Sequence, residues 1–310
     1  MTQLASLKRG WALLVLAGSM CWSAMAMAAT PLVTTNWLAD RLANDRLVVI
    51  DLRNKIDSGS YETFLQGHIP GSVHSDYLRD GWRVGKDDVV GLLPTEAQFE
   101  ALARKLGVSS DSHVILVPAG VSSTDFGSAA RAYWTFKTFG HAKVSILDGG
   151  YKSWLAAGGQ TQTGAQSVTA SRFTARTQSE FTAVTMDEIA SWIDAGTCPQ
   201  ILDARASDRF MGIAKEPRPG LRSGHIPGAI NVPISSLLDP ETGMVKSADR
   251  LKQIFDEAGV NYDAPAITSC GSGVTACGLI LGLAMTGKTD ISLYDGSWSE
   301  WGASDKPIAP

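Results

Sequence analysis

Short apolar runs alternate with amphipathic stretches along most of the chain. Apolar runs of strand length lie at 46–51, 113–117 and 143–147. Stretches with the apolar spacing of a helix lie at 36–42, 95–106 and 129–139. Because buried strands that alternate with helices form parallel sheets, this pattern predicts an α/β fold, with a mostly parallel sheet and helices on both faces.

The second half of the chain repeats the order of the first. Ile201-Leu202-Asp203 corresponds to Val49-Ile50-Asp51, and the turn Gly-His-Ile-Pro-Gly occurs at 67–71 and again at 224–228. Further on, 265–268 corresponds to the run at 113–117, and 293–298 to 146–151. A repeat of this length indicates two similar domains, which we expect at 31–158 and 183–310. Between them, residues 159–182 lack apolar periodicity and predict a linker along the surface.

Composition and the N-terminus narrow the class of protein. The 310 residues carry a net charge of −4 and are 44% hydrophobic, which is typical of a globular chain of about two domains. An acidic chain argues against nucleic acid as a partner. Residues 1–28 combine Lys8 and Arg9, an apolar stretch and small residues before a cleavage site, which predicts a signal peptide and export to a bacterial periplasm. The apolar stretch is too short for a membrane span, so none is expected after cleavage.

Cysteine usage points to an unpaired thiol. Once the signal peptide is removed with Cys21, the chain keeps Cys198, Cys270 and Cys277, an odd number for an oxidising compartment. Their spacing fits neither zinc nor haem attachment, so we expect no metal and no cofactor. We expect Cys277 in the core, and Cys198 in a turn without an assignable partner.

One of these cysteines lies between a predicted strand and a predicted helix. Residues 265–268 predict a buried strand, and 278–287 are apolar on every face, which predicts a buried helix that ends at Gly287. The loop between them contains Cys270-Gly271-Ser272-Gly273-Val274-Thr275. Such a loop turns backbone N–H groups toward one point, attracts anions and favours a thiolate over a thiol. Cys270 is therefore a candidate nucleophile, with a buried structural cysteine as the alternative.

Three motifs together resemble the tandem-domain rhodanese sulfurtransferases. They are the two His-Ile-Pro-Gly turns, the cysteine loop, and residues 294–301, Tyr-Asp-Gly-Ser-Trp-Ser-Glu-Trp. The resemblance covers essentially the whole chain after the predicted signal and implies two tandem rhodanese-like domains. The cysteine loop is similar to that of the 3-mercaptopyruvate sulfurtransferases. Thiosulfate-preferring members typically carry basic residues directly after the cysteine, where this chain has Gly271 and Ser272.

The resemblance implies a function with two alternatives. It implies transfer of sulfane sulfur from 3-mercaptopyruvate to a thiol or cyanide through a persulfide on Cys270. Thiosulfate as donor is one alternative, and a non-catalytic persulfide carrier for a partner protein is the other. The expected partners are a small anionic donor and a thiol, cyanide or protein-thiol acceptor. A cysteine phosphatase is disfavoured, because those enzymes carry an arginine six positions after the cysteine, where Ala276 stands.

The resemblance also suggests which residues bind and activate the donor. Backbone N–H groups of the loop are expected to hold the persulfide, among them those of Gly271, Gly273 and Val274. The hydroxyls of Ser272 and Thr275 are expected to donate to sulfur or to the leaving group, with capping of the following helix as the alternative.

Two arginines align with the family's substrate-binding arginines. They are Arg209 and Arg218, and a planar guanidinium suits a carboxylate or a sulfonate. The alternative is a surface ion pair with Asp208 or Glu216, which contributes little stability.

The first half departs from the catalytic pattern. Pro118 stands where the second half has Cys270, so we expect an inert first domain that forms a wall of the cleft. In mercaptopyruvate enzymes, a histidine and an aspartate of the first domain have been proposed to activate the loop serine. Here Gly91 falls at the place of that histidine, and His74 lies out of register near Asp76 and Asp80.

Some polar residues recur at matching positions in both halves. His68 and His225 lie in the two repeated turns, one of which belongs to the half expected to be inert. We therefore expect both histidines to be structural. We likewise expect Asp203 and Arg205 to form a structural pair near the end of a strand.

Overall fold

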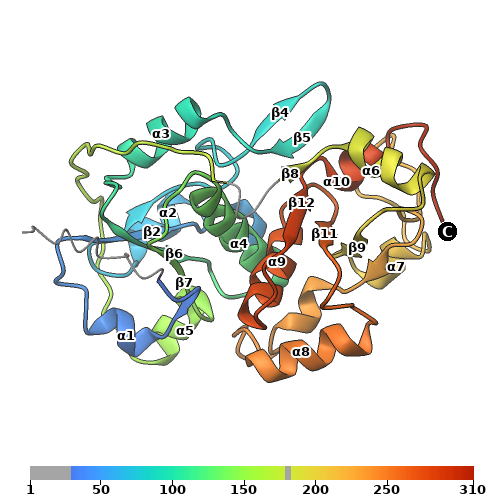
Figure 1. The fold of residues 1–310 in the computed structure, drawn as a ribbon. Helices are drawn as coiled ribbons and strands as arrows, with labels where there is room; N and C mark the ends of the chain where they lie inside the picture. Colours follow the sequence, from blue (N-terminus) through green and yellow to red (C-terminus); the bar gives the residue numbers. More distant parts are fainter. Residues whose placement is uncertain (1–28, 179–182) are drawn as a thin grey trace, which may run out of the picture.

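The protein contains two five-stranded parallel sheets, one in each half, as described by a computed structural model (Figure 1). The structure describes residues 29–178 and 183–310, so the predicted signal peptide and part of the predicted linker lie outside it. The strand order is β1-β7-β6-β2-β3 in the first sheet and β8-β12-β11-β9-β10 in the second. These orders correspond strand for strand, which confirms the α/β fold of two similar parallel sheets.

The first half alternates strands and helices as predicted. Its strands are β1 (Leu32–Val33), β2 (Leu47–Asp51), β3 (Val73–His74), β6 (His113–Val117) and β7 (Val144–Leu147), with a separate hairpin of β4 (Val84–Lys86) and β5 (Val89–Leu92). Its helices are α1 (Thr35–Ala39), α2 (Tyr61–Gln66), α3 (Glu96–Lys105), α4 (Ser123–Thr138) and α5 (Gly150–Ala156), with a 3₁₀ turn at Lys55–Asp57.

The second half follows the same order. Its strands are β8 (Ala183–Val184), β9 (Gln200–Asp203), β10 (Ile230–Asn231), β11 (Ala266–Ser269) and β12 (Ile291–Tyr294). Its helices are α6 (Met186–Asp194), α7 (Ser207–Phe210), α8 (Ala248–Glu257), α9 (Ala276–Met285) and α10 (Ser297–Trp301), with a 3₁₀ turn at Ile234–Leu237.

Helices cover both faces of the first sheet. Successive residues of a strand point to opposite faces. In β6, Val114 and Leu116 join the core formed with α3 and α4, whereas Ile115 and Val117 join the core formed with α1 and α5. This explains why the strand is a continuous apolar run and does not alternate with polar residues.

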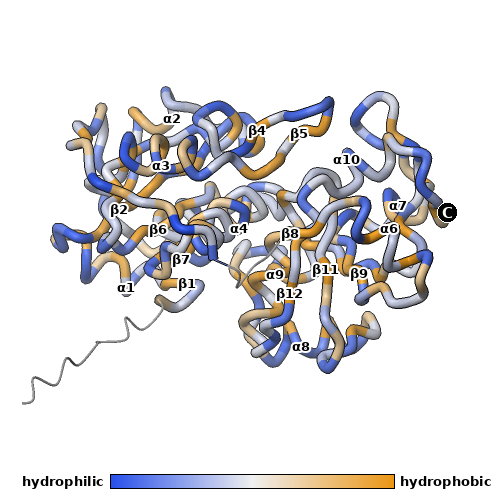
Figure 2. Tube along the Cα trace, turned by 45° about the horizontal axis from the view of Figure 1, so that its top comes forward, coloured by the Kyte–Doolittle hydropathy of each residue, from blue (hydrophilic) through white to orange (hydrophobic). Residues whose placement is uncertain are grey.

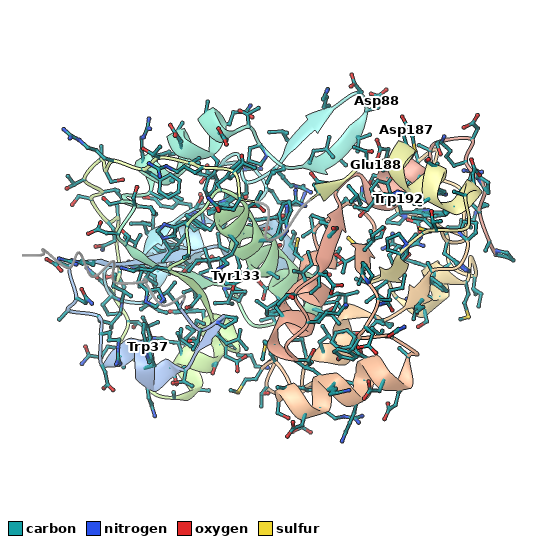
Figure 3. All side chains as sticks on the ribbon, viewed as in Figure 1. Trp37, Asp88, Tyr133, Asp187, Glu188 and Trp192 are labelled. Atoms are coloured by element: carbon teal, nitrogen blue, oxygen red, sulfur yellow. The ribbon has the colours of Figure 1, made fainter. Side chains whose placement is uncertain are left out.

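The two halves share one continuous core. Helix α4 of the first half contacts α9 of the second, and one cluster of buried side chains includes residues of both helices (Figure 1). Residues 276–283 of α9 are all buried, as its apolar sequence predicted, and Figure 2 shows the helix as hydrophobic. Tyr133 of α4, labelled in Figure 3, also belongs to this shared core.

Two segments differ from the sequence-based expectation. Helix α4 begins at Ser123, six residues before the predicted start at Ala129, because the Ser122 hydroxyl accepts from the Asp125 N–H and caps the helix there. The described part of the predicted linker packs on the first half. Phe173 is 2% exposed within the core, and its carbonyl accepts from the Arg104 guanidinium at 2.7 and 2.9 Å.

Polar pairs repeated in the two halves have matching structural roles. Arg53 pairs with Asp51 and donates to the Gly67 carbonyl, as Arg205 pairs with Asp203 and donates to that of Gly224. Within residues 29–178 and 183–310, no helix has the length and hydropathy that crossing a membrane requires.

Candidate active site

Cys270 lies at the carboxyl end of β11, the middle strand of the second sheet. In parallel α/β sheets, ligands bind at this edge. The Cys270 side chain is nearly buried, with the residue 1% exposed, and its N–H donates to the Ser297 hydroxyl at 3.1 Å. The Ser272 N–H points at the Cys270 Sγ, with N and S 3.5 Å apart. This places a backbone donor at the sulfur of the candidate nucleophile.

Residues at the start of α10 hold the loop from outside. The Cys270 carbonyl accepts from the Trp298 N–H at 2.9 Å. The Gly271 carbonyl accepts from the Ser299 N–H at 3.0 Å and from the Ser299 hydroxyl at 2.6 Å. These bonds explain why the Gly-Ser-Trp-Ser motif accompanies the cysteine loop, because its residues turn the loop carbonyls away from the sulfur.

Most of the loop's N–H groups are left without a protein acceptor. Within the described part of the chain, those of residues 271, 273, 274 and 275 donate to no acceptor, and that of Ser272 meets only the thiol. Buried N–H groups are normally paired, so such a set is a site for an anion. The helix that follows adds the positive end of its dipole.

Two loop glycines are required by close contacts. Gly273 has φ +71°, and a Cβ there would lie 2.5 Å from the Asp295 carbonyl oxygen. A Cβ at Gly271 would lie 3.2 Å from an Arg209 nitrogen and 3.4 Å from an Arg218 nitrogen. Gly271 therefore lets both guanidinium groups approach the loop closely.

The cleft above Cys270 has a volume of about 310 Å³ and is formed by both halves. Seven of the predicted site residues line it: Arg209, Arg218, Cys270, Gly271, Ser272, Val274 and Thr275. Gly273 faces away from the cleft, toward Asp295. The first half contributes lining residues that sequence reasoning missed, namely Ile56, Tyr77, Leu78, Arg83 and Thr124.

Arg218 contacts the loop directly. Its guanidinium donates to the Ser272 hydroxyl at 3.0 Å and to the Gly271 carbonyl at 3.3 Å. Burial lowers the pKa of Arg218; the Cys270 thiolate counteracts this, and the nearby charges of Arg209 and Arg83 lower it further. An anionic ligand in the cleft would relieve this repulsion among cations.

Arg209 makes the ion pair that was considered as its alternative role, although the pair is not on the surface. Its guanidinium lies 2.5 Å from a Glu216 oxygen, and the Glu216 side chain is 1% exposed. Glu216 also pairs with the buried Arg205 at 2.9 Å. The pair thus fixes Arg209 beside Gly271 while Arg209 still lines the cleft. Donor binding by Arg209 stays a prediction.

Arg83 is the cation that the sequence did not reveal. It belongs to no motif and precedes β4, yet it lines the cleft and stacks over the Tyr77 ring. Within the described residues it has no acidic partner within salt-bridge distance. Its place in the cleft depends on how the segment before β4 packs against the second half, which the sequence alone does not show.

The loop hydroxyls do not cap α9. Thr275 is the residue before the helix, but its side chain accepts no capping hydrogen bond and instead lines the cleft. Ser272 accepts from Arg218, as described above. Neither finding assigns a catalytic role, but both leave these hydroxyls facing the place where a donor would bind.

The histidine relay proposed for mercaptopyruvate enzymes has no counterpart in this cleft. No histidine is among the described residues that line it. Gly91 lies against the loop, where a Cβ would be 2.6 Å from the Ser272 carbonyl oxygen. His74 Nε2 bonds the Arg53 carbonyl at 2.8 Å and lines a separate hollow with Asp76 and Asp80.

The other cysteines and the two turn histidines have structural surroundings. The Cys277 thiol donates to the Gly273 carbonyl, and burial raises the pKa of Cys277 to about 12. Cys198 is unpaired, and partial burial raises its pKa. His68 and His225 bond backbone carbonyls of Gln162 and Phe210 through Nδ1, which supports a structural role for both histidines.

Comparison with known proteins agrees with this geometry. The model of the rhodanese-like domain matches residues 34–157 and 185–304. The chain is 38% identical to the 3-mercaptopyruvate sulfurtransferase of Escherichia coli K12 (92% of this chain, 99% of the relative) and 35% identical to the thiosulfate sulfurtransferase of Gallus gallus (87% and 92%). The crystal structure of SseA from Escherichia coli superposes with a TM-score of 0.75 at 36% identity (88% of this chain, 100% of that chain). The chain belongs to the rhodanese family.

Proposed function

We propose that the protein is a 3-mercaptopyruvate sulfurtransferase that carries the transferred sulfur as a persulfide on Cys270. The single observation that carries this proposal is the set of N–H groups in the loop after Cys270: that of Ser272 points at the sulfur, and four others have no acceptor in the described chain. The outer sulfur of a persulfide anion on Cys270 would accept hydrogen bonds from these N–H groups.

The first half-reaction loads the cysteine. The Cys270 thiolate attacks the sulfur of the donor, so that an S–S bond forms and the C–S bond breaks. The electron pair of the C–S bond stays on the carbon as the enolate of pyruvate, which takes up one proton to become pyruvate. The positive charge of Arg218 faces the donor's carboxylate, and the loop N–H groups hold the sulfur.

The second half-reaction returns the thiolate. An acceptor thiolate attacks the outer sulfur of the persulfide, and the S–S bond breaks with its electron pair on the Cys270 sulfur. The acceptor leaves as a persulfide, or as thiocyanate when the acceptor is cyanide. The two half-reactions share one site, so the kinetics should be ping-pong.

Two observations favour 3-mercaptopyruvate over thiosulfate, and one favours the reverse. Gly271 and Ser272 place no cation directly after the cysteine, and the Escherichia coli relative is named for 3-mercaptopyruvate. Arg83, however, adds a further positive charge to the cleft, which suits a dianion such as thiosulfate. Thiosulfate is therefore the second candidate donor.

The test compares both donors on the purified protein. With 3-mercaptopyruvate and cyanide we expect thiocyanate and pyruvate in equal amounts, with a higher kcat/KM than with thiosulfate. Donor alone should add the mass of about one sulfur atom to the protein, and cyanide should remove it. A higher kcat/KM with thiosulfate would reverse the donor assignment. Loading with transfer only to a protein thiol would indicate the carrier role.

Substitution of the nucleophile tests the persulfide. Cys270→Ser should lower turnover by about 10³-fold or more, because the covalent intermediate is lost. Cys198→Ser is the matched control, since Cys198 does not line the cleft, and it should retain full activity. Full activity of Cys270→Ser with either donor would contradict the mechanism.

We also propose export of the protein to a periplasm. The support is the sequence of residues 1–28 alone, which has a basic start, a short apolar stretch and small residues before position 29. The mass of the protein isolated from its native source tests this proposal. A mature N-terminus near Ala29 supports export, whereas an intact N-terminus contradicts it.

A further inference from the structure

A buried arginine of the first half contacts the catalytic loop of the second. Arg131 lies on α4 and its side chain is 0% exposed. One terminal nitrogen donates to the Gly273 carbonyl at 3.0 Å and to an Asp295 carboxylate oxygen at 2.6 Å. The other donates to the Gly91 carbonyl at 3.1 Å. One side chain thus connects the cysteine loop, the residue after β12 and the β4–β5 hairpin.

A buried charge of this kind needs a reason beyond stability. Burial of an ion pair often contributes no net stability compared with apolar residues of similar volume. The ion pair is also reinforced from the first half, because the second Asp295 oxygen accepts from the Leu93 N–H at 2.7 Å. The Gly273 carbonyl itself accepts from the Arg131 guanidinium at 3.0 Å and from the Cys277 thiol at 3.3 Å.

The orientation of the Gly273 carbonyl decides where the next N–H points. A peptide unit is planar and trans, so its C=O and N–H point in opposite directions. The peptide unit of Gly271 and Ser272 illustrates the consequence: Ser299 holds the Gly271 carbonyl on one side, and the Ser272 N–H points at the Cys270 sulfur on the other. Gly273 and Val274 form the corresponding peptide unit two residues further along the loop.

We propose that Arg131 is a positioning residue for sulfur transfer, which holds the Gly273 carbonyl outside the loop so that the Val274 N–H is aimed at the persulfide. Val274 lines the cleft, and its N–H has no acceptor within the described residues. The inference rests on the proposed function and extends it. The inert first half then contributes to catalysis through the orientation of a donor in the second.

The experiment compares Arg131→Met with Arg53→Met in the full chain. Arg53 is a matched control because it is also a nearly buried arginine of the first half in an ion pair, with Asp51, and it does not touch the loop. For each variant, kcat and the donor KM are measured, with the rate of Cys270 alkylation by iodoacetamide at pH 7 and the lifetime of the loaded persulfide.

Arg131→Met should lower kcat by about 10- to 100-fold, somewhat less than the loss of a whole donor group. The donor KM should stay within about threefold, because Arg209 and Arg218 are untouched. Cys270 should be alkylated several-fold more slowly, and the persulfide should decay faster. Arg131→Lys, which keeps one charged donor, should recover part of kcat. Arg53→Met should lower stability and leave kcat and alkylation within about twofold.

A folded Arg131→Met protein with kcat and alkylation rate within about twofold of the natural protein would overturn the proposal. If Arg131→Met does not fold, Asp295→Asn decides, since it keeps the side-chain shape and removes the charge that orients Arg131. We expect it to lower kcat by about tenfold; an unchanged kcat would overturn the proposal. If the natural protein transfers no sulfur, the proposed function fails, whereas the alkylation rates still decide the role of Arg131.

Discussion

Each half has a loop between its middle strand and a long helix, but the N–H groups of the two loops meet different partners. In the first half the Asp125 carboxylate accepts from the N–H groups of Ala119, Gly120 and Val121, at 2.9, 2.6 and 3.2 Å. In the second half the corresponding N–H groups have no acceptor within the described residues, apart from Ser272, which points at the thiol. The first loop carries a built-in anion, whereas the second is left open for one that arrives with the donor.

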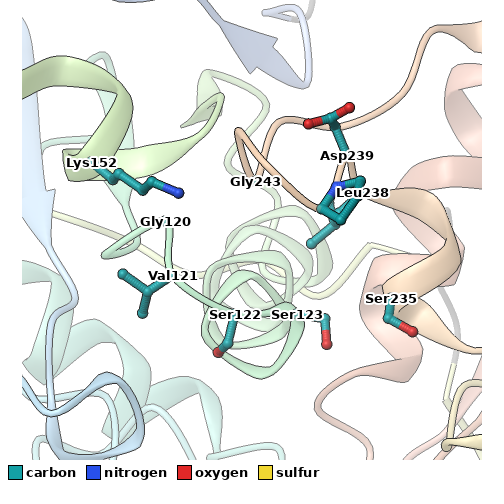
Figure 4. A pocket seen from close by; sticks show the side chains of 10 residues that line it. Gly120, Val121, Ser122, Ser123, Lys152, Ser235, Leu238, Asp239 and Gly243 are labelled. Atoms are coloured by element: carbon teal, nitrogen blue, oxygen red, sulfur yellow. The ribbon is translucent and has the colours of Figure 1, made fainter. Parts of the chain in front are cut away.

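The surroundings of the two loops differ in the same sense. Near the first loop, the hollow between the halves has a volume of about 160 Å³ and is lined by Ser122, Ser123 and Lys152, among others (Figure 4). Lys152 donates to the Glu241 carbonyl. Neither a cysteine nor an arginine is among the described residues that line this hollow. The first loop thus lacks the nucleophile and the arginines of the second, and Asp125 occupies its N–H groups.

Removal of a cation that lines the cleft beside the second loop should have the largest effect. Arg218→Met should raise the donor KM by about 10- to 100-fold, because a charge-assisted hydrogen bond contributes about 1.5–3 kcal/mol. Arg83→Met should raise the KM less, since Arg83 makes no direct contact with the loop. Steady-state kinetics with 3-mercaptopyruvate measures both. Lys215→Met is the control, because it removes the same charge from an exposed residue. An equal rise in KM for this variant would show that only long-range attraction of the donor matters.

Removal of the built-in anion from the first loop should change stability and not activity. Asp125→Ala leaves buried N–H groups without an acceptor, so the free energy of unfolding should fall by about 2–3 kcal/mol. Chemical denaturation measures the change, and kcat/KM should stay within about twofold. Asp111→Ala is the control, because Asp111 is 65% exposed in its ion pair and its loss should change stability little. A stability unchanged by Asp125→Ala would contradict the role of this carboxylate.

The residues that follow α4 and α9 should make the stability of the two halves depend differently on pH. His141 and Lys288 each follow a glycine there and are each 4% exposed. Lys288 stays paired with Asp290 and two carbonyls, whereas burial lowers the pKa of His141 to about 4. The unfolded chain binds this proton below about pH 6.5 and the folded chain only near pH 4, so stability falls as the pH falls between these values.

For His141 alone, the fall between pH 8 and pH 5 should be about 2 kcal/mol. Denaturant unfolding at several pH values measures it against His141→Gln, which does not titrate. The variant should lose this part of the pH dependence and keep the part due to other groups. Parallel curves for the two proteins would show that His141 does not contribute.

Installation of a cysteine in the first loop should have the smallest effect of all. Pro118→Cys places a thiol where the second half has Cys270, but the Asp125 carboxylate already occupies the N–H groups. We therefore expect no additional sulfur after incubation with donor. Mass spectrometry of the Cys270→Ser/Pro118→Cys double variant measures this directly. A persulfide on residue 118 would mean that the loop amides are still available.

The sequence was informative where local pattern and repetition determine structure. The strands at 113–117 and 266–269, the buried helix after Cys270 and the cleft position of most loop residues follow from short motifs and apolar runs. Arg131 was missed because it looks like an ordinary polar residue on a helix, while its partners lie 142 and 164 residues further along the chain. Arg83 was missed for the same reason, since only the arrangement of the halves brings it to the cleft.

Most of the described linker is exposed, as its composition predicted, but burial of Phe173 could not be read from that composition. Phe173 is a single apolar residue without periodic neighbours, so pattern alone gave no sign of burial. Its pocket is formed by residues of the first half, among them Phe99 and Phe136. The start of α4 had a local signal, because Ser122 precedes Asp125 by the spacing of a helix cap.

The shared core of α4 and α9 also constrains how the chain is made. The first half is synthesised before α9 exists, so the apolar face of α4 that α9 covers is exposed until the second half has been completed. The nascent first half therefore exposes this face, together with the guanidinium of Arg131, until Asp295 and Gly273 have been synthesised. Packing of α9 on α4 covers both, so we expect the cysteine loop and the interface between the halves to form together.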